Sequence, residues 1–398
     1  MAQAIKTRVV GNGVTATVTF NLGGISKVTA SQLSTERFCL AATNVGNYAL
    51  FGGGYSFSSV VDAYNVNLVR STPTVLSVAR GCLTSTKVGN YALFGGGESY
   101  SYSKTSTVDA YDANLTRSTP TSLSCERYLL SSTIVGNYAL FGGGSNGNTM
   151  QGSWFSIVDA YNTSLTRSTP TALSVARESL ASTTIGDYAL FGGGLGYSEK
   201  YSTVDAYNTS LTRSTPTALS EARCNLAATT VGDYALFGGG YVSSQSLVVD
   251  AYNTSLIRST PTALSQARES LAATTIGNYA LFGGGESSNY VGSNTVDSYD
   301  TSLLRSSVSD LSFARWGLAS TTVSDYALFG GGRYGGANYS STVDAYYTQS
   351  SSKTIQLYPG TKYKFSNMSS EATSETFQEM TLSPPISGYI KVTNTTIN

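Results

Sequence analysis

The chain has 398 residues, of which 40% are hydrophobic and only 12% are charged. Its 24 Lys and Arg residues balance its 24 Asp and Glu residues, which argues against nucleic acid or an anionic membrane as the main partner, because both attract an excess of positive charge. The 41 Gly and 28 Tyr residues favour strands and tight turns. The chain contains no His, which excludes catalytic and zinc sites built on imidazole.

The two ends of the chain, residues 1–24 and 349–398, do not repeat. Residues 1–6 lack the apolar run of a secretion signal, so we expect synthesis in the cytosol without a signal peptide. Four segments predict strands by their alternation or β-branched content: Val14–Phe20, Thr354–Tyr358, Lys362–Phe365 and Tyr389–Val392. We predict that residues 1–24 and 349–398 form one small β subdomain; disordered tails are the alternative.

The segment Ile25–Leu33 predicts how the rest of the chain closes. The middle of the chain consists of seven repeats, which are described below. The segment Ile25–Leu33 matches the last part of such a repeat, with Lys27 in the place of the Arg found there, but no repeat precedes it. The seventh repeat lacks this end, since Ser350 stands where a Leu is expected. We therefore expect residues 25–34 to supply the outer strand of the seventh unit, within a repeat region of residues 25–348, which covers an exposed edge.

Three sequence anchors recur seven times in the middle of the chain. Gly triplets begin 43 to 50 residues apart at Gly52, Gly95, Gly142, Gly192, Gly238, Gly283 and Gly330. An Arg stands 15 residues before each triplet, at Arg37, Arg80, Arg127, Arg177, Arg223, Arg268 and Arg315. A Val-Asp-(Ala/Ser)-Tyr motif follows each triplet, with its Asp at Asp62, Asp109, Asp159, Asp205, Asp250, Asp297 and Asp344. Such periodicity indicates a repeat architecture.

One unit predicts four strands. They are Leu180–Ile185, Tyr188–Phe191, Thr203–Tyr207 and Leu211–Thr215. Gly186 and Asp187 form a two-residue hairpin turn, and the Gly triplet marks a place where no side chain fits or where φ is positive. Four strands in a unit of this length are typical of a propeller blade.

The unit resembles the kelch repeat. The shared features are the hydrophobic run that ends in glycines at Tyr188–Gly194, the third strand with Asp205 and Tyr207, and the Arg before each first strand. The resemblance covers about residues 25–347 and implies an all-β, seven-bladed kelch-type β-propeller of the galactose-oxidase-like type. The chain lacks the Trp usual in the kelch fourth strand, where Leu211 and Arg213 stand instead.

The loops between the second and third strands differ from the near-verbatim framework. They are Tyr55–Val60, Glu98–Thr107, Ser145–Ile157, Leu195–Thr203, Tyr241–Val248, Glu286–Thr295 and Arg333–Thr342. Strand directions place these loops, the Arg and the Asp on one face. The loops combine Tyr, Ser, Gly and Asn as a paratope does. The alternative is that they are solvent-exposed loops whose sequences vary without a function. We predict a binding surface built on the aromatic residues of these loops: Tyr55, Phe57, Tyr100, Tyr102, Trp154, Phe155, Tyr197, Tyr201, Tyr241, Tyr290, Tyr334 and Tyr339.

The seven Arg and seven Asp match in number and face, so we predict a structural ring of ion pairs. An anion site at the mouth of the channel is the alternative. Catalysis is not expected, and neither is a metal or cofactor, because the copper site of galactose oxidase needs histidines. The loop carboxylates Glu98, Glu199 and Glu286 leave a carbohydrate-active enzyme as a third possibility.

We therefore expect a non-catalytic binding or structural propeller. The repeats, the low Lys content and the Tyr/Ser/Gly richness resemble bacteriophage virion proteins such as fibre, tail or capsid-decoration components. The expected partners are a host-surface glycan or protein at the loops and other virion proteins at the terminal subdomain, in a homo-oligomer at the virion surface. A cytoplasmic kelch adaptor for protein–protein interaction is the alternative.

Overall fold

The computed structural model describes residues 3–8, 16–55, 57–147, 153–288, 291–336, 338–357, 362–364, 376–383 and 391–396. The chain divides into two compact units, residues 1–26 with 348–398 and residues 27–347. Among the described residues, no helix has the length and apolar character needed to cross a membrane.

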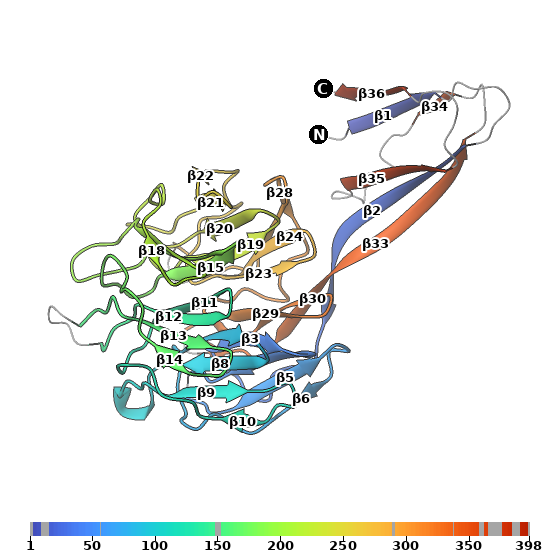
Figure 1. Cartoon of the computed structure of the whole chain (residues 1–398). Helices are drawn as coiled ribbons and strands as arrows, with labels where there is room; N and C mark the ends of the chain where they lie inside the picture. Colours follow the sequence, from blue (N-terminus) through green and yellow to red (C-terminus); the bar gives the residue numbers. More distant parts are fainter. Residues whose placement is uncertain are drawn as a thin grey trace. The chain divides into compact units, whose positions relative to one another are not determined.

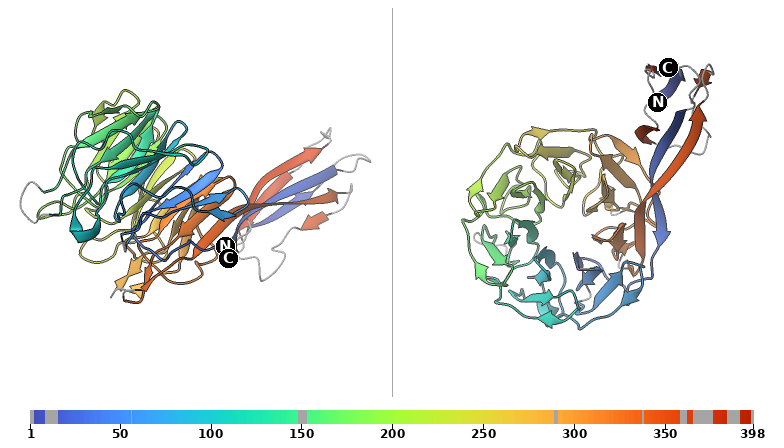
Figure 2. Two further views of the ribbon diagram at one scale, coloured as in Figure 1. Left: turned by 90° about the horizontal axis from the view of Figure 1, so that it is seen from below. Right: turned by 45° about the vertical axis from the view of Figure 1, so that its right-hand side comes forward.

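The larger unit is a seven-bladed β-propeller, which confirms the predicted fold class (Figures 1 and 2). The first strands are β3 Ala41–Val45, β7 Thr84–Val88, β11 Ser131–Val135, β15 Ala181–Ile185, β19 Ala227–Val231, β23 Ala272–Ile276 and β29 Ala319–Val323. The second strands are β4 Tyr48–Gly52, β8 Tyr91–Gly95, β12 Tyr138–Gly142, β16 Tyr188–Gly192, β20 Tyr234–Gly238, β24 Tyr279–Gly283 and β30 Tyr326–Gly330. The third strands are β5 Val61–Asn65, β9 Val108–Tyr111, β13 Val158–Asn162, β17 Val204–Asn208, β21 Val249–Asn253, β27 Val296–Asp300 and β33 Val343–Leu357.

The fourth strands are shorter than predicted. They are β6 Arg70–Ser71, β10 Arg117–Ser118, β14 Arg167–Ser168, β18 Arg213–Ser214, β22 Arg258–Ser259 and β28 Arg305–Ser307. The expected strand Leu211–Thr215 begins only at Arg213, because Leu211 has a φ of +60° and lies in the turn. Asn208 Oδ1 holds that turn by accepting hydrogen bonds from the N–H groups of Ser210 and Thr212.

The hydrophobic cores lie between neighbouring blades. Leu190 and Val204 of blade four pack in one cluster with Phe237 and Tyr252 of blade five. Gly192 makes this contact possible, since a Cβ there would lie 2.8 Å from the Phe237 ring. Each blade therefore depends on its neighbours for a core, as in other repeat proteins.

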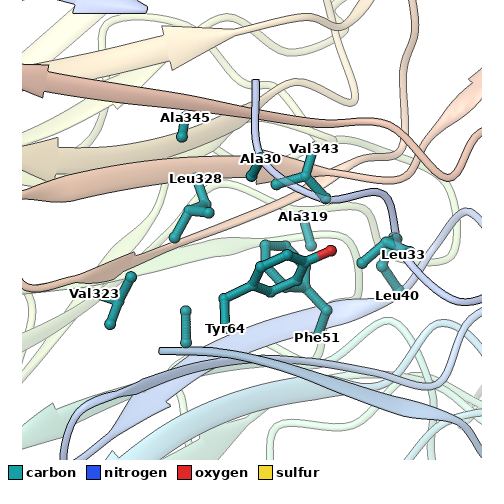
Figure 3. Close-up of a cluster of buried hydrophobic side chains, with 11 residues drawn as sticks. Ala30, Leu33, Leu40, Phe51, Tyr64, Ala319, Val323, Leu328, Val343 and Ala345 are labelled. Carbon is teal, nitrogen blue, oxygen red and sulfur yellow. The ribbon is translucent and has the colours of Figure 1, made fainter. Parts of the chain in front are cut away.

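The N-terminal segment completes blade seven, as the sequence indicated. Strand β2 (Ala16–Thr29) is the neighbour of β33 in the sheet that contains β29 and β30. Lys27 Nζ lies 3.5 Å from Asp344 Oδ1, where the other blades place an Arg. Figure 3 shows Ala30 and Leu33 in one cluster with side chains of blades seven and one.

The terminal unit contains several of the predicted strands. β1 (Gln3–Arg8) pairs with β34 (Lys362–Lys364) and β36 (Lys391–Thr396), and β35 (Thr376–Ser383) pairs with β2 along Thr17–Gly23. The predicted ends at Val14, Tyr358, Phe365 and Tyr389 lie outside the described residues.

A buried carboxylate joins the parts of each blade. In blade four, Asp205 Oδ2 lies 2.8 Å from Arg177 Nη2, and Asp205 Oδ1 lies 2.8 Å from Arg213 Nη1. The same carboxylate accepts a 3.0 Å hydrogen bond from the N–H of Ser174, in the segment that enters the blade. Arg177 and Asp205 are fully buried. The seven Arg that precede the Gly triplets and the seven Asp of the Val-Asp motifs form ion pairs in the same way.

A closed ring of backbone hydrogen bonds surrounds the channel. The residue two positions after each buried Arg donates its N–H to the carbonyl of the corresponding residue in the preceding blade, and the last bond, from Cys39 N to Gly317 O, closes the ring at 2.9 Å. All seven residues have positive φ: Cys39, Cys82, Leu129, Ser179, Asn225, Ser270 and Gly317. Only the seventh is a glycine, so the ring keeps six strained residues.

We predict that Asp205→Ala lowers the free energy of unfolding by about 3–5 kcal/mol, because it leaves the buried Arg177 without a carboxylate. Arg213→Ala should cost about 1 kcal/mol, because its side chain is a quarter exposed and Asp205 keeps Arg177. Denaturant unfolding of both variants measures the difference. Equal losses would contradict the central role of the carboxylate.

Candidate functional site

The candidate site is the surface formed by the seven loops between second and third strands, here called the loop face. In all seven blades, the residue after the buried Arg pairs with the residue after the Gly triplet through an isolated β-bridge, and this pairing fixes the base of each loop. The pairs are Phe38 with Tyr55, Gly81 with Glu98, Tyr128 with Ser145, Glu178 with Leu195, Cys224 with Tyr241, Glu269 with Glu286 and Trp316 with Arg333.

A continuous set of aromatic rings crosses the loops of blades seven, one and two. Tyr339 stacks on Phe38 at 4.8 Å between ring centroids, and Phe38 stacks on Tyr55 at 5.1 Å. Tyr55 contacts Phe57 at 4.9 Å between ring centroids. Phe57 in turn makes edge-to-face contacts with Tyr100 at 6.1 Å and with Tyr102 at 6.4 Å. We call these six residues the aromatic path: Tyr339, Phe38, Tyr55, Phe57, Tyr100 and Tyr102.

The end of the aromatic path in blade two is exposed and held in place. Tyr100 is 80% exposed and Tyr102 is 73% exposed. Phe57, Ser101 and Tyr102 have positive φ, a conformation that costs free energy in non-glycine residues and is frequent at functional sites. Lys104 Nζ donates to the carbonyl of Tyr102 at 2.8 Å and to Glu98 Oε1 at 2.6 Å, so one side chain fixes the strained turn.

The other predicted aromatic residues do not join this path. Trp154 and Tyr197 form a separate edge-to-face pair at 5.7 Å, and Lys200 Nζ lies 4.9 Å from the Tyr241 ring centroid. Tyr334 contacts Phe313 at 5.2 Å. Phe155 and Tyr201 are half-buried, and Tyr290 lies outside the described residues.

The carboxylates of the loop face are engaged by neighbouring blades. Tyr55 Oη donates to Glu98, and Ser145 Oγ donates to Glu178. Glu269 accepts hydrogen bonds from Asn225 Nδ2 at 2.8 Å and Gln245 Nε2 at 3.2 Å. Inter-blade contacts of this kind stiffen the base of the loops.

Two carboxyl groups of the loop face, those of Glu178 and Glu286, are harder to ionise than usual. Burial raises the pKa of Glu178. Burial and then the nearby charge of Glu269 raise the pKa of Glu286. Glu199, the other loop carboxylate named from the sequence, is exposed.

Below the loops, the channel contains a cavity of about 290 Å³. Its lining includes ring residues Cys39, Cys82, Ser179 and Asn225 and the leucines that follow them in each repeat. The buried Arg and Asp of the framework have no exposed surface, so they do not face a ligand there. Among the described residues, no three His, Cys, Asp or Glu side chains gather into a group able to hold a metal ion.

Sequence reasoning missed the residue that follows each buried Arg. It named the loop aromatics, but Phe38 and Trp316, which contact Tyr55 and Arg333, were not among them. The signal was present, because this position is different in nearly every repeat while its neighbours recur: Phe38, Gly81, Tyr128, Glu178, Cys224, Glu269 and Trp316.

No protein-family model and no curated protein matches the chain. Solved structures do match it, among them the structure of YjhT, with a TM-score of 0.59 and 12% identity over 70% of this chain and 99% of that chain. A likeness at this identity shows the fold alone, and it supports a kelch-like propeller.

We predict that Lys104→Met loosens the turn at Ser101 and Tyr102 without unfolding the propeller. Amide hydrogen exchange in residues 99–103 should accelerate about fivefold or more, because a hydrogen bond from a charged donor contributes about 1 kcal/mol or more. The control is Lys87→Met, which removes an exposed Lys from strand β7. Unchanged exchange in Lys104→Met would show that other contacts hold the turn.

Proposed function

We propose that this protein is a non-catalytic adhesion module that binds a surface glycan through its loop face. The aromatic path carries the proposal, because it offers a row of rings from three blades and ends in two exposed tyrosines. Aromatic faces stack on the apolar faces of sugars. The strained, anchored turn at Tyr102 supports this use, because a rigid ring loses little conformational entropy on binding.

We further propose that the module belongs to a bacteriophage particle, as part of a fibre, tail or capsid decoration. The support is compositional: near-verbatim repeats carry variable loops on one face, and charged residues are few. In such a particle the terminal unit would attach the propeller to other virion proteins. Copurification of the chain with purified virions tests this part, and its absence from the particles would refute it.

We predict that Tyr100→Ala combined with Tyr102→Ala weakens glycan binding by about tenfold or more, because each exposed ring contributes about 1 kcal/mol or more to affinity. A glycan array followed by calorimetry on the best ligand measures the effect. Val69→Ser is the surface control, since Val69 is 59% exposed next to the short fourth strand β6 of blade one.

A second double variant, Tyr102→Ala with Trp154→Ala, tests whether the separate pair in blades three and four contributes. If both double variants bind like the unmodified protein, the loop face is not the binding surface. If the array shows no glycan bound at all, the proposal of glycan binding fails.

A further inference from the structure

One arginine of the propeller differs from all the others. Each of the other thirteen arginines between Arg37 and Arg315 lies within 4.0 Å of an aspartate carboxylate. Arg333 has no carboxylate of the described residues within that distance. It also occupies a loop position, directly after a Gly triplet, where no other repeat has an Arg.

Arg333 is nevertheless held firmly. Its guanidinium carbon lies 5.7 Å from the ring centroids of both Phe38 and Trp316. Its Nε–H donates to the carbonyl of Gly336. Its backbone exchanges two hydrogen bonds with Trp316, at 2.8 Å and 3.1 Å. The two rings orient the guanidinium without neutralising its charge, and the two terminal nitrogens have no acceptor among the described residues.

This arrangement suits the recognition of an anion. A guanidinium with its Nε edge already bonded presents its remaining N–H groups in one plane, which matches the paired oxygens of a carboxylate or sulfate. The aromatic contacts reduce the entropy that Arg333 would lose when it binds such a group.

Arg333 also adjoins the aromatic path. Phe38 contacts Tyr339, Tyr55 and Arg333. A sugar ring that stacks on the path near Phe38 therefore has a positive charge within reach of its substituents. Glu286 is a competing group, because the positive charge of Arg333 acts to lower the pKa of Glu286 although the two side chains form no ion pair.

We propose that Arg333 is an anion subsite of the loop face, and that the glycan bound there is acidic, carrying a carboxylate or a sulfate group. The inference rests on the proposed glycan binding and adds the chemical class of the ligand.

The experiment uses the full chain on an array that pairs each acidic oligosaccharide with a neutral counterpart. The carboxylated sugars are matched with carboxyl-reduced forms, and the sulfated sugars with desulfated forms. We expect the acidic member of a pair to bind about tenfold or more tightly, and Arg333→Gln to abolish that preference. Whether carboxylated or sulfated pairs show the preference identifies the source of the charge.

Three further variants sharpen the result. Arg333→Lys should recover only part of the preference, because an ammonium lacks the planar pair of donors. Glu286→Gln should strengthen binding of the acidic sugar, because it removes a competing negative charge. Lys87→Gln, which removes one positive charge from strand β7, should leave the preference unchanged.

The outcomes separate the two proposals. Equal binding of acidic and neutral partners, or a preference that survives in Arg333→Gln, overturns the anion subsite while glycan binding stands. A preference lost equally in Lys87→Gln shows a general charge effect and also overturns it. No binding to any glycan refutes the proposed function itself, and the subsite with it.

Discussion

The buried aspartate of each blade is the interaction on which the rest of the propeller depends. It receives a fully buried Arg from the start of its blade, a second Arg from the fourth strand and a backbone N–H from the incoming segment, with Lys27 in the place of the second Arg in blade seven. A lone buried charge would be very costly, but three donors around one carboxylate satisfy it. The contact fixes where the chain enters a blade, where the short outer strand lies, and therefore where the variable loops begin.

The separation between a repeated framework and variable loops explains why the loops tolerate changes in sequence and length. The framework places its charges and most of its large side chains in contacts that repeat from blade to blade, and the loops above them make few of these contacts. Variation is thus confined to one face, where aromatic rings gather across blades seven, one and two. The positive φ values at Phe57, Ser101 and Tyr102 lie in this variable region, where a few side chains such as Lys104 hold them.

The fold could be predicted from the sequence because its signals are local and occur seven times. The Gly triplets, the buried Arg and the Val-Asp motif each fix a strand end or an ion pair, and Lys27 in the place of an Arg revealed the closure of the ring. The fourth strands were predicted too long. Leu211 and its equivalents have positive φ because they lie in a turn that a side chain caps, and the alternation of hydrophobic and polar residues does not reveal such a turn. One member of the aromatic path, Phe38, was not predicted, because it precedes its first strand and meets Tyr339 only when the ring closes.

That closure also has a consequence for how the protein is made. The outer strand of blade seven is translated first, yet its partner β33 begins some three hundred residues later, at Val343. The early segment must wait with an unpaired edge until the last repeat leaves the ribosome, so the ring cannot close before blade seven has been made. A chain stalled or cut before that point would expose the edge strand, which gives a quality-control system a simple mark of an unfinished ring.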